Sequence, residues 1–144
     1  MAREFEDCIS KNKLIKIPPD PAIAGAELVE SEHDLASARD DLKLKNWKWA
    51  TDKAYYSMFH AARGILLMKG YKEQSHACLI IAVHELFINE GILERKFLDF
   101  LISGKKRRED AIYASTYSEE IARAHIEAAR EFISAAKALI RKER

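Results

Sequence analysis

Residues 47–69 are apolar around so much of a helical circumference that they constrain the fold more than any other part of the chain. Two apolar stripes follow this segment at helical spacing. One comprises Ala50, Ala54, Met58, Ala61, Ile65 and Met68, and the other comprises Tyr55, Phe59, Ala62 and Leu66. Gly70 is expected to end the helix, because glycine adopts the left-handed conformation at a helix C-terminus without strain. The sequence therefore predicts a bundle with this helix at its centre.

The segment before this helix has the features of a neighbouring helix. Asp20 and Pro21 predict its start, because aspartate caps free backbone N–H groups and proline suits the first helical turn. The apolar stripe that follows extends to Leu42. Lys45 and Asn46 are expected to form a tight turn, with Asn46 in the left-handed conformation.

Three further helices are expected after Gly70. One begins at Ser75 and ends before Gly91, the next begins near Leu93, and the last follows a capping box at residues 116–119. Short connections favour antiparallel packing of successive helices. We therefore predict an all-α fold, an up-and-down antiparallel bundle of four to five helices.

A single domain is expected over residues 1–144, because chains of about 100–150 residues commonly form one domain. Residues 1–19 are predicted to form a short N-terminal helix and an extended strap, since Pro18 and Pro19 each disfavour helix in the preceding residue. Residues 20–142 are predicted to form the helical bundle. No segment shows the sustained alternation of a β-strand.

The net charge and the two cysteines limit which binding partners and which cellular compartment can be expected. A formal net charge of +1 gives the chain no overall attraction for nucleic acid, so any attraction must come from a local basic patch. Cys8 and Cys78 are predicted to be small apolar side chains in a reducing compartment. Residues 1–6 lack the apolar core of a signal peptide, and no apolar run approaches the roughly 20 residues that span a bilayer. A cytoplasmic protein without membrane association is expected.

Several cofactor and metal motifs are missing from the sequence. It contains no Gly-x-Gly-x-x-Gly and no Gly-Lys-Ser/Thr loop, which excludes phosphate cradles of those kinds. His84 and Glu85 begin a zinc-protease pattern, but Ile88 occupies the position of the second histidine. We therefore expect neither a cofactor nor a metal.

The basic segment, residues 105–108, offers a local patch of positive charge. Its first three cations are expected on a solvated face. Arg108 differs, because steps of four and three residues from Phe97 place it on the apolar side of its helix. A guanidinium in that position needs an anionic or aromatic partner. Arg108 is therefore a candidate site residue.

A polar ridge lies on the central helix. Asp52, Tyr56, His60 and Arg63 follow one another at spacings of four, four and three, and so share one face. The simpler interpretation is that this face is the solvent edge of the helix. The alternative is a cleft wall that offers a hydroxyl, an imidazole and a guanidinium to a phosphodiester, with the imidazole able to transfer protons.

Two motifs carry a resemblance to a known family. Residues 54–67, Ala-Tyr-Tyr-Ser-Met-Phe-His-Ala-Ala-Arg-Gly-Ile-Leu-Leu, resemble the central-helix signature of a prokaryotic subfamily of HEPN domains. Residues 108–113, which read Arg-x-x-Ala-x-Tyr, resemble the second motif of that subfamily. Residues 17–19 and the helix start at residues 75–76 also fit, and the resemblance extends from about residue 4 to residue 140.

The resemblance implies a helical bundle that forms homodimers. In many HEPN proteins, an arginine and a histidine four to six residues later cleave RNA without a metal ion, and such proteins often act as toxins paired with a minimal nucleotidyltransferase. Arg108 and Tyr113 match the motif, but residues 112–114 contain no histidine. The next one, His125, follows Arg108 by 17 residues on a different predicted helix. Ile112 replaces the acidic residue expected beside the motif tyrosine.

The sequence leaves three functions open. The first is an RNA- or nucleotide-associated protein in a toxin–antitoxin-like pair with a minimal nucleotidyltransferase, acting as a metal-independent ribonuclease. The second is a non-catalytic dimer that binds a nucleotide or docks a partner, and the third is a purely structural dimer. The candidate catalytic residues are Arg108 and His60, and the candidate nucleic-acid or nucleotide-binding residues are Tyr113, Tyr56, Arg63, Arg107 and Lys106.

Overall fold

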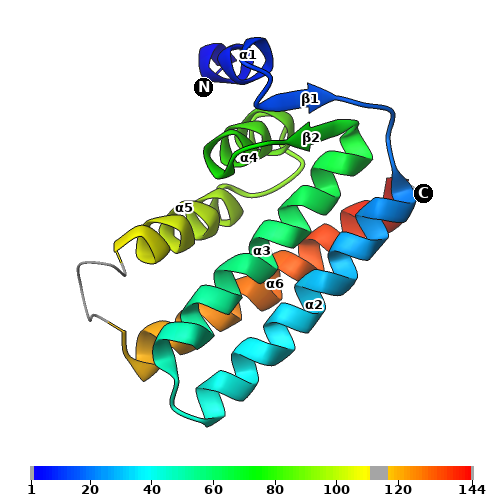
Figure 1. Ribbon diagram of the computed structural model, residues 1–144. Helices are drawn as coiled ribbons and strands as arrows, with labels where there is room; N and C mark the ends of the chain where they lie inside the picture. The colour runs from blue at the N-terminus through cyan, green and yellow to red at the C-terminus, as the bar shows by residue number, and fades with distance from the viewer. Residues whose placement is uncertain (1, 111–116, 144) are drawn as a thin grey trace.

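Four long helices form the body of the protein and run alternately up and down (Figure 1). The computed structural model describes residues 2–110 and 117–143, with the backbone alone for residues 108–110 and 143. The four helices are α2 (Pro21–Lys43), α3 (Trp47–Lys69), α5 (Arg95–Asp110) and α6 (Glu119–Glu143). This arrangement confirms the predicted all-α antiparallel bundle.

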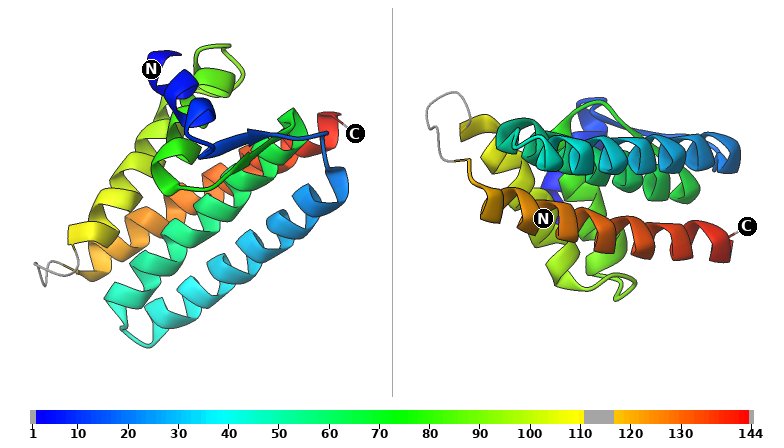
Figure 2. Two further views of the ribbon diagram at one scale, coloured as in Figure 1. Left: turned by 45° about the horizontal axis from the view of Figure 1, so that its top comes forward. Right: turned by 90° about the horizontal axis from the view of Figure 1, so that it is seen from below.

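α3 is the central helix of the bundle and packs against α2, α5 and α6. Viewed from below, α2 and α3 lie side by side and α6 lies against the pair (Figure 2). Every residue of the two predicted apolar stripes is buried. At Gly64 the helices come especially close, since an added Cβ would lie 3.2 Å from the Ala24 carbonyl oxygen and 3.2 Å from Ile140 Cδ1. The central position of this helix is therefore confirmed.

Short elements cover one end of α3 (Figure 1). They are α1 (Ala2–Ser10), β1 (Leu14–Lys16), β2 (Tyr71–Glu73), α4 (His76–Val83) and η1 (His84–Ile88), a π-helical continuation of α4. β1 and β2 pair antiparallel, with Leu14 opposite Glu73 and Lys16 opposite Tyr71. The expectation of a chain without strands was wrong, because strands of three residues are too short for their alternation to be detected in the sequence.

The helix ends agree with most of the predicted signals. The Asp20 side chain accepts a hydrogen bond from the Ile23 N–H at 3.1 Å, and Gly70 ends α3 with φ of 88°. At the turn between α2 and α3 the left-handed residue is Lys45, with φ of 63°, and not Asn46 as predicted. α6 is capped by Ser118, which accepts from the Ile121 N–H at 3.1 Å. The predicted capping residue at position 116 lies outside the described residues.

A disulfide joins Cys8 of α1 to Cys78 of α4, with a Cα–Cα distance of 5.9 Å. This corrects the prediction that the two cysteines are separate, reduced thiols. The sequence separation of 70 residues gave no indication of the pairing. The short α1 lies beside α4 because the β1–β2 pairing brings the two segments together, and that contact is a tertiary one.

In the part of the chain that the structure describes, no helix combines the length and the apolar character that crossing a lipid bilayer requires.

Candidate functional site

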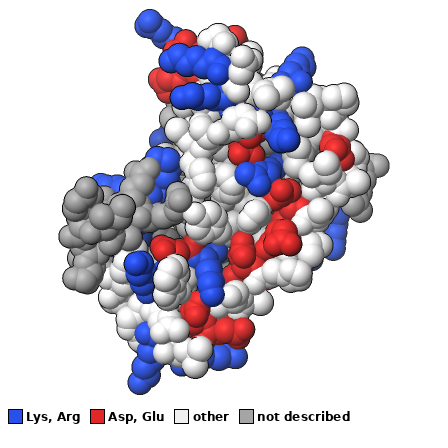
Figure 3. Space-filling view, in the orientation of Figure 1, with Lys and Arg blue, Asp and Glu red and all other residues white. Residues whose placement is uncertain are grey.

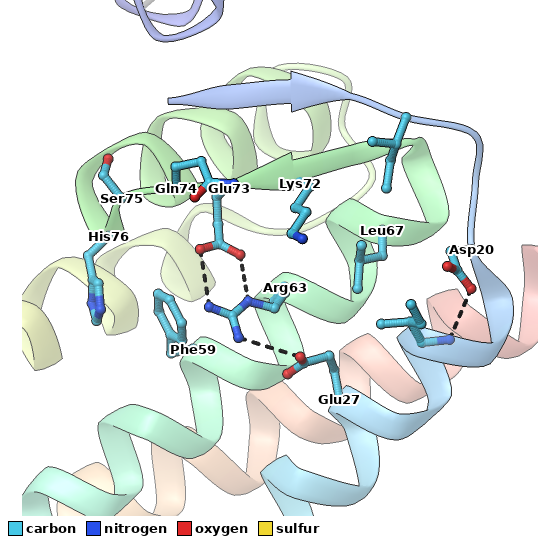
Figure 4. A pocket seen from close by; sticks show the side chains of 12 residues that line it. Asp20, Glu27, Phe59, Arg63, Leu67, Lys72, Glu73, Gln74, Ser75 and His76 are labelled. Atoms are coloured by element: carbon cyan, nitrogen blue, oxygen red, sulfur yellow. Dashed lines mark hydrogen bonds and ion pairs between the residues drawn. The ribbon is translucent and has the colours of Figure 1, made fainter. Parts of the chain in front are cut away.

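A hollow in the described surface lies between α2, α3, β2 and the beginning of α4. We call it the central hollow, and its volume is about 700 Å³. Apolar side chains form part of the wall, among them Ile17, Phe59 and Leu67, and polar side chains converge on the rest (Figure 4). The polar lining residues are Asp20, Glu27, Arg63, Lys72, Glu73, Gln74, Ser75 and His76.

Arg63 is the centre of the polar wall and points from α3 toward β2 (Figure 4). Its guanidinium donates to both carboxylate oxygens of Glu73, with Nη2 at 3.2 Å from Oε2, and to Glu27 Oε1 at 3.4 Å. Only 5% of the Glu73 side chain is exposed. A carboxylate that is so deeply buried needs a cationic partner, and the bidentate contact with Arg63 supplies one. Arg63 therefore ties β2 and α2 to the central helix.

His60 lies one turn before Arg63 on α3, and it too contacts carboxylates of α2. Its Nδ1 lies 2.6 Å from Glu27 Oε2, and its Nε2 lies 3.6 Å from Asp34 Oδ2. The hydrogen bond with Glu27 raises the pKa of His60, with burial opposing the increase. Burial alone would raise the pKa of Glu27, but the hydrogen bond with His60 and the charge of Arg63 outweigh it and lower that pKa. The pair thus favours an imidazolium beside a carboxylate.

This ion pair makes the stability contribution of His60 dependent on pH. A group whose pKa is raised on folding stabilises the protein below its unfolded-state pKa, and the contribution is lost as the pH rises through its folded-state pKa. His60→Gln is therefore expected to lower the denaturation midpoint more at a pH of about 5.5 than at about 8.5. His33→Gln, at an exposed position of α2, is the matched control. A His60→Gln effect that is equal at both pH values would contradict this assignment.

Aromatic side chains form a stack on the wall of the central hollow. The His76 ring stacks on Phe59 with centroids 4.1 Å apart, and the Arg63 guanidinium lies 4.7 Å from the centroid of the Phe59 ring. The Tyr55 hydroxyl lies 2.8 Å from His76 Nδ1. The sequence analysis placed Tyr55 and Phe59 on an apolar stripe and did not connect them with His76. The only available signal was the helix start at Ser75, which fixes the position of His76.

The structure locates the predicted site residues in two regions. Tyr56, His60 and Arg63 are all half-buried on α3, so the ridge is neither a fully solvated edge nor an open cleft wall. Of the three, only Arg63 lines the central hollow. Lys106 is exposed and Arg107 half-buried on α5. Position 108 belongs to the α5 backbone, and both the Arg108 side chain and Tyr113 lie outside the described residues.

The face that carries the central hollow has mixed charge. Figure 3 shows acidic side chains gathered along its α2–α3 side, with lysine and arginine side chains among them. Within the hollow, the carboxylates of Asp20, Glu27 and Glu73 accompany the cations Arg63 and Lys72. Such a lining suits an internal ion-pair network or a small polar ligand better than the phosphate backbone of a nucleic acid, which binds to unpaired cations. Among the described side chains, no cluster of three or more His, Cys, Asp or Glu residues is placed to share a metal ion.

Comparison with known proteins gives consistent results at the level of family. The HEPN domain model matches residues 27–140. "UPF0332 protein PH1297" of Pyrococcus horikoshii is 40% identical over 73 residues, which cover 49% of this chain and 50% of that protein. The match thus spans half the length of that relative. "Putative toxin MJ0605" of Methanocaldococcus jannaschii is 30% identical over 108 residues, which cover 74% of this chain and 81% of that protein.

The fold also occurs in a solved structure. The chain is similar to TT1696 from Thermus thermophilus, with a TM-score of 0.68 and 16% sequence identity. The match covers 81% of this chain and 97% of the other. At this identity the likeness supports the fold and carries no information about activity.

Proposed function

Because the chain belongs to the HEPN family, we propose that it is the toxin-like member of a two-protein pair with a minimal nucleotidyltransferase, and that it acts on RNA as a metal-independent endoribonuclease. The observation that carries this proposal is the similarity to the Methanocaldococcus protein, which is named "Putative toxin MJ0605" and is matched over 81% of its length. A homodimer is part of the proposal, because the site expected from the family resemblance is completed in a dimer cleft.

The basic segment on α5 is the part of the chain suited to RNA. Lys106 is exposed, and Arg107 is half-buried on the same helix. Cations of this kind bind the phosphate backbone, and a guanidinium stabilises the charge that develops on a phosphate during cleavage. In this proposal Arg108 performs that role, and Tyr113 positions the RNA.

Replacing Arg108 with alanine is expected to abolish both growth inhibition in cells and RNA cleavage in vitro. Loss of a charge-stabilising group in a phosphoryl-transfer site commonly reduces the rate by about 100-fold or more. The measurement is the cleavage of total RNA by purified protein, together with growth after induced expression. Arg141→Ala, an exposed cation near the end of α6, is the matched control for loss of charge. If wild type and Arg108→Ala are equally inactive in both assays, the ribonuclease proposal fails.

One observation favours the second function, a non-catalytic binding module. His60 and Arg63, both proposed from the sequence as site residues, are already paired with carboxylates of α2 and β2. Such pairing leaves neither of these two groups as an uncompensated cation for a phosphate. In this alternative the protein docks the nucleotidyltransferase or binds a nucleotide without cleaving RNA. Calorimetric titration of the purified protein with ATP, and co-purification with the nucleotidyltransferase, distinguish the two functions.

A further inference from the structure

The first helix, α1, depends on few contacts for its position beside α4 (Figure 1). Of its nine residues, Phe5 and Cys8 are buried and Ile9 is half-buried. The Phe5 ring packs edge-on against Tyr71 of β2, with the ring centroids 5.8 Å apart. A helix of this length is marginal in water without tertiary support. The disulfide between Cys8 and Cys78 is therefore the main constraint that keeps α1 on α4.

A hollow opens beside this disulfide, and we call it the α1–α4 hollow. Its volume is about 200 Å³, and both cysteines line it. Cys8 and Cys78 are otherwise well covered, at 4% and 5% exposure, so a reagent from solution approaches the bond from this hollow. A space of this size holds several water molecules, or the thiol-bearing end of a small molecule.

Charged side chains of both signs line the α1–α4 hollow. Lys11 and Lys13 supply two cations, and Glu4 and Asp7 supply two carboxylates. Thiol–disulfide exchange begins with attack by a thiolate, and the two lysines favour an anion close to the bond. A thiol that also carries carboxylate and ammonium groups matches a lining of mixed charge. The α1–α4 hollow therefore favours zwitterionic thiols, the chemical class of cysteine and glutathione.

The two cysteines occupy opposite ends of their helices. Cys78 is in the first turn of α4, where its backbone N–H donates to the Ser75 hydroxyl at 3.1 Å. Cys8 is in the last turn of α1. The N-terminal end of a helix stabilises an anion, whereas the C-terminal end disfavours one. Cys78 is therefore the better leaving thiolate, and attack is expected at Cys8 Sγ.

We infer that the Cys8–Cys78 bond is a reversible exchange site, which a zwitterionic low-molecular-weight thiol reaches through the α1–α4 hollow. Opening of the bond releases α1 from α4. Residues 72–76, which form one wall of the central hollow, directly precede the first turn of α4 that carries Cys78. This wall loses its anchor to α1 at the same time. The inference is independent of the proposed ribonuclease function.

The exchange takes place in two steps that balance with two molecules of the small thiol. In the first step, its thiolate forms a bond to Cys8 Sγ, the Cys8–Cys78 bond breaks, and Cys78 leaves as a thiolate that takes a proton from water. In the second step, another thiolate attacks the outer sulfur of the mixed disulfide, and Cys8 leaves as a thiolate. Two small thiols are oxidised to their disulfide, and one protein disulfide is reduced. The reverse reaction, with the small disulfide as oxidant, restores the bond.

Reduction of the folded protein by glutathione, followed by mass spectrometry, tests the exchange site. The reference thiol is 2-mercaptoethanol, which carries no carboxylate or ammonium group. Lys11→Gln/Lys13→Gln is expected to lower the ratio of the glutathione rate to the 2-mercaptoethanol rate by about tenfold, because the attraction for the carboxylates is lost. Lys43→Gln/Lys142→Gln, which removes two exposed lysines of α2 and α6, is the matched control and should leave the ratio unchanged. The first mixed disulfide should be found on Cys8.

Two results of this measurement would overturn the inference. If the bond opens only when the whole protein unfolds, the reduction rate will level off at the unfolding rate and will be the same for both thiols. If the rate ratio of Lys11→Gln/Lys13→Gln equals that of the wild type, the hollow does not select the thiol.

Hydrogen exchange followed by mass spectrometry tests the release of α1. After reduction, the amides of residues 2–10 should exchange about tenfold faster or more, since a nine-residue helix is marginal without its anchor. Residues 71–76 should also lose protection, whereas the amides of α6 should not change. Cys8→Ser/Cys78→Ala should behave as the reduced wild-type protein does. Equal protection of α1 in the oxidised and the reduced protein would contradict the inference.

Discussion

Replacing Arg63 with methionine is expected to lower the free energy of unfolding by about 3–5 kcal/mol, the usual cost of breaking a buried ion pair. The reason is that the substitution leaves the carboxylate of Glu73 without its cationic partner. Glu73 is only 7% exposed, and its two carboxylate oxygens accept from the Arg63 guanidinium. Without that partner, the carboxylate on β2 stays buried without a counter-charge or moves into water, and either outcome weakens the contact between the β1–β2 pair and α3.

Equilibrium unfolding in urea, followed by circular dichroism, measures this effect. Arg130→Met is the matched control, because Arg130 also pairs with a glutamate, Glu127, but the side chains are 50% and 59% exposed. Solvent screens such a pair, so its loss should matter far less. The double variant Arg63→Met/Glu73→Gln should recover part of the stability, since it removes the orphaned charge. Equal losses of unfolding free energy in the Arg63 and Arg130 variants would show that the buried pair stabilises the protein no more than the exposed pair does.

Removal of the disulfide between Cys8 and Cys78 is expected to lower the free energy of unfolding by about 4 kcal/mol. The bond closes a loop with a sequence separation of 70 residues, and a cross-link of that span restricts the unfolded chain by about this amount. Both side chains are buried, at 4% and 5% exposure, so Cys8→Ser together with Cys78→Ala removes the bond with little change in volume. The fold of the four long helices should survive, because α1 packs only at the end of the bundle.

Unfolding with and without a reductant tests this prediction. The wild-type protein should be less stable in the presence of a reductant, whereas the Cys8→Ser/Cys78→Ala variant should be unaffected by it. A wild-type protein that unfolds at the same urea concentration under both conditions would argue that the bond contributes nothing to stability. The comparison separates the effect of the bond from any effect of the substitutions.

The central helix shows why so much of the fold could be predicted from the sequence. The burial of α3 on several sides follows from its two apolar stripes, and its end follows from Gly70. These signals are local, because each depends only on residues a few positions apart. The β1–β2 pair and the disulfide depend on contacts between residues 8–17 and 70–78, and no local pattern encodes them.

In the candidate site, too, the features that depend on local spacing were predicted and those that depend on tertiary contacts were not. The spacing of Tyr56, His60 and Arg63 correctly placed them on one face of a helix, since helical periodicity requires it. Their partners, Glu27 and Glu73, come from α2 and β2 and were not predicted. Each carboxylate looks like an ordinary surface residue in the sequence. Only the packing of three elements around one hollow gives them their role.

The bond between Cys8 and Cys78 also makes the first half of the molecule one covalent ring. That ring contains the strap, α2, α3 and β2, whereas α5 and α6 lie outside it. A protease that cuts the exposed turn at Lys45 and Asn46 would therefore leave the nicked chain in one covalent piece. A cut beyond α5 would instead release α6 as a separate peptide.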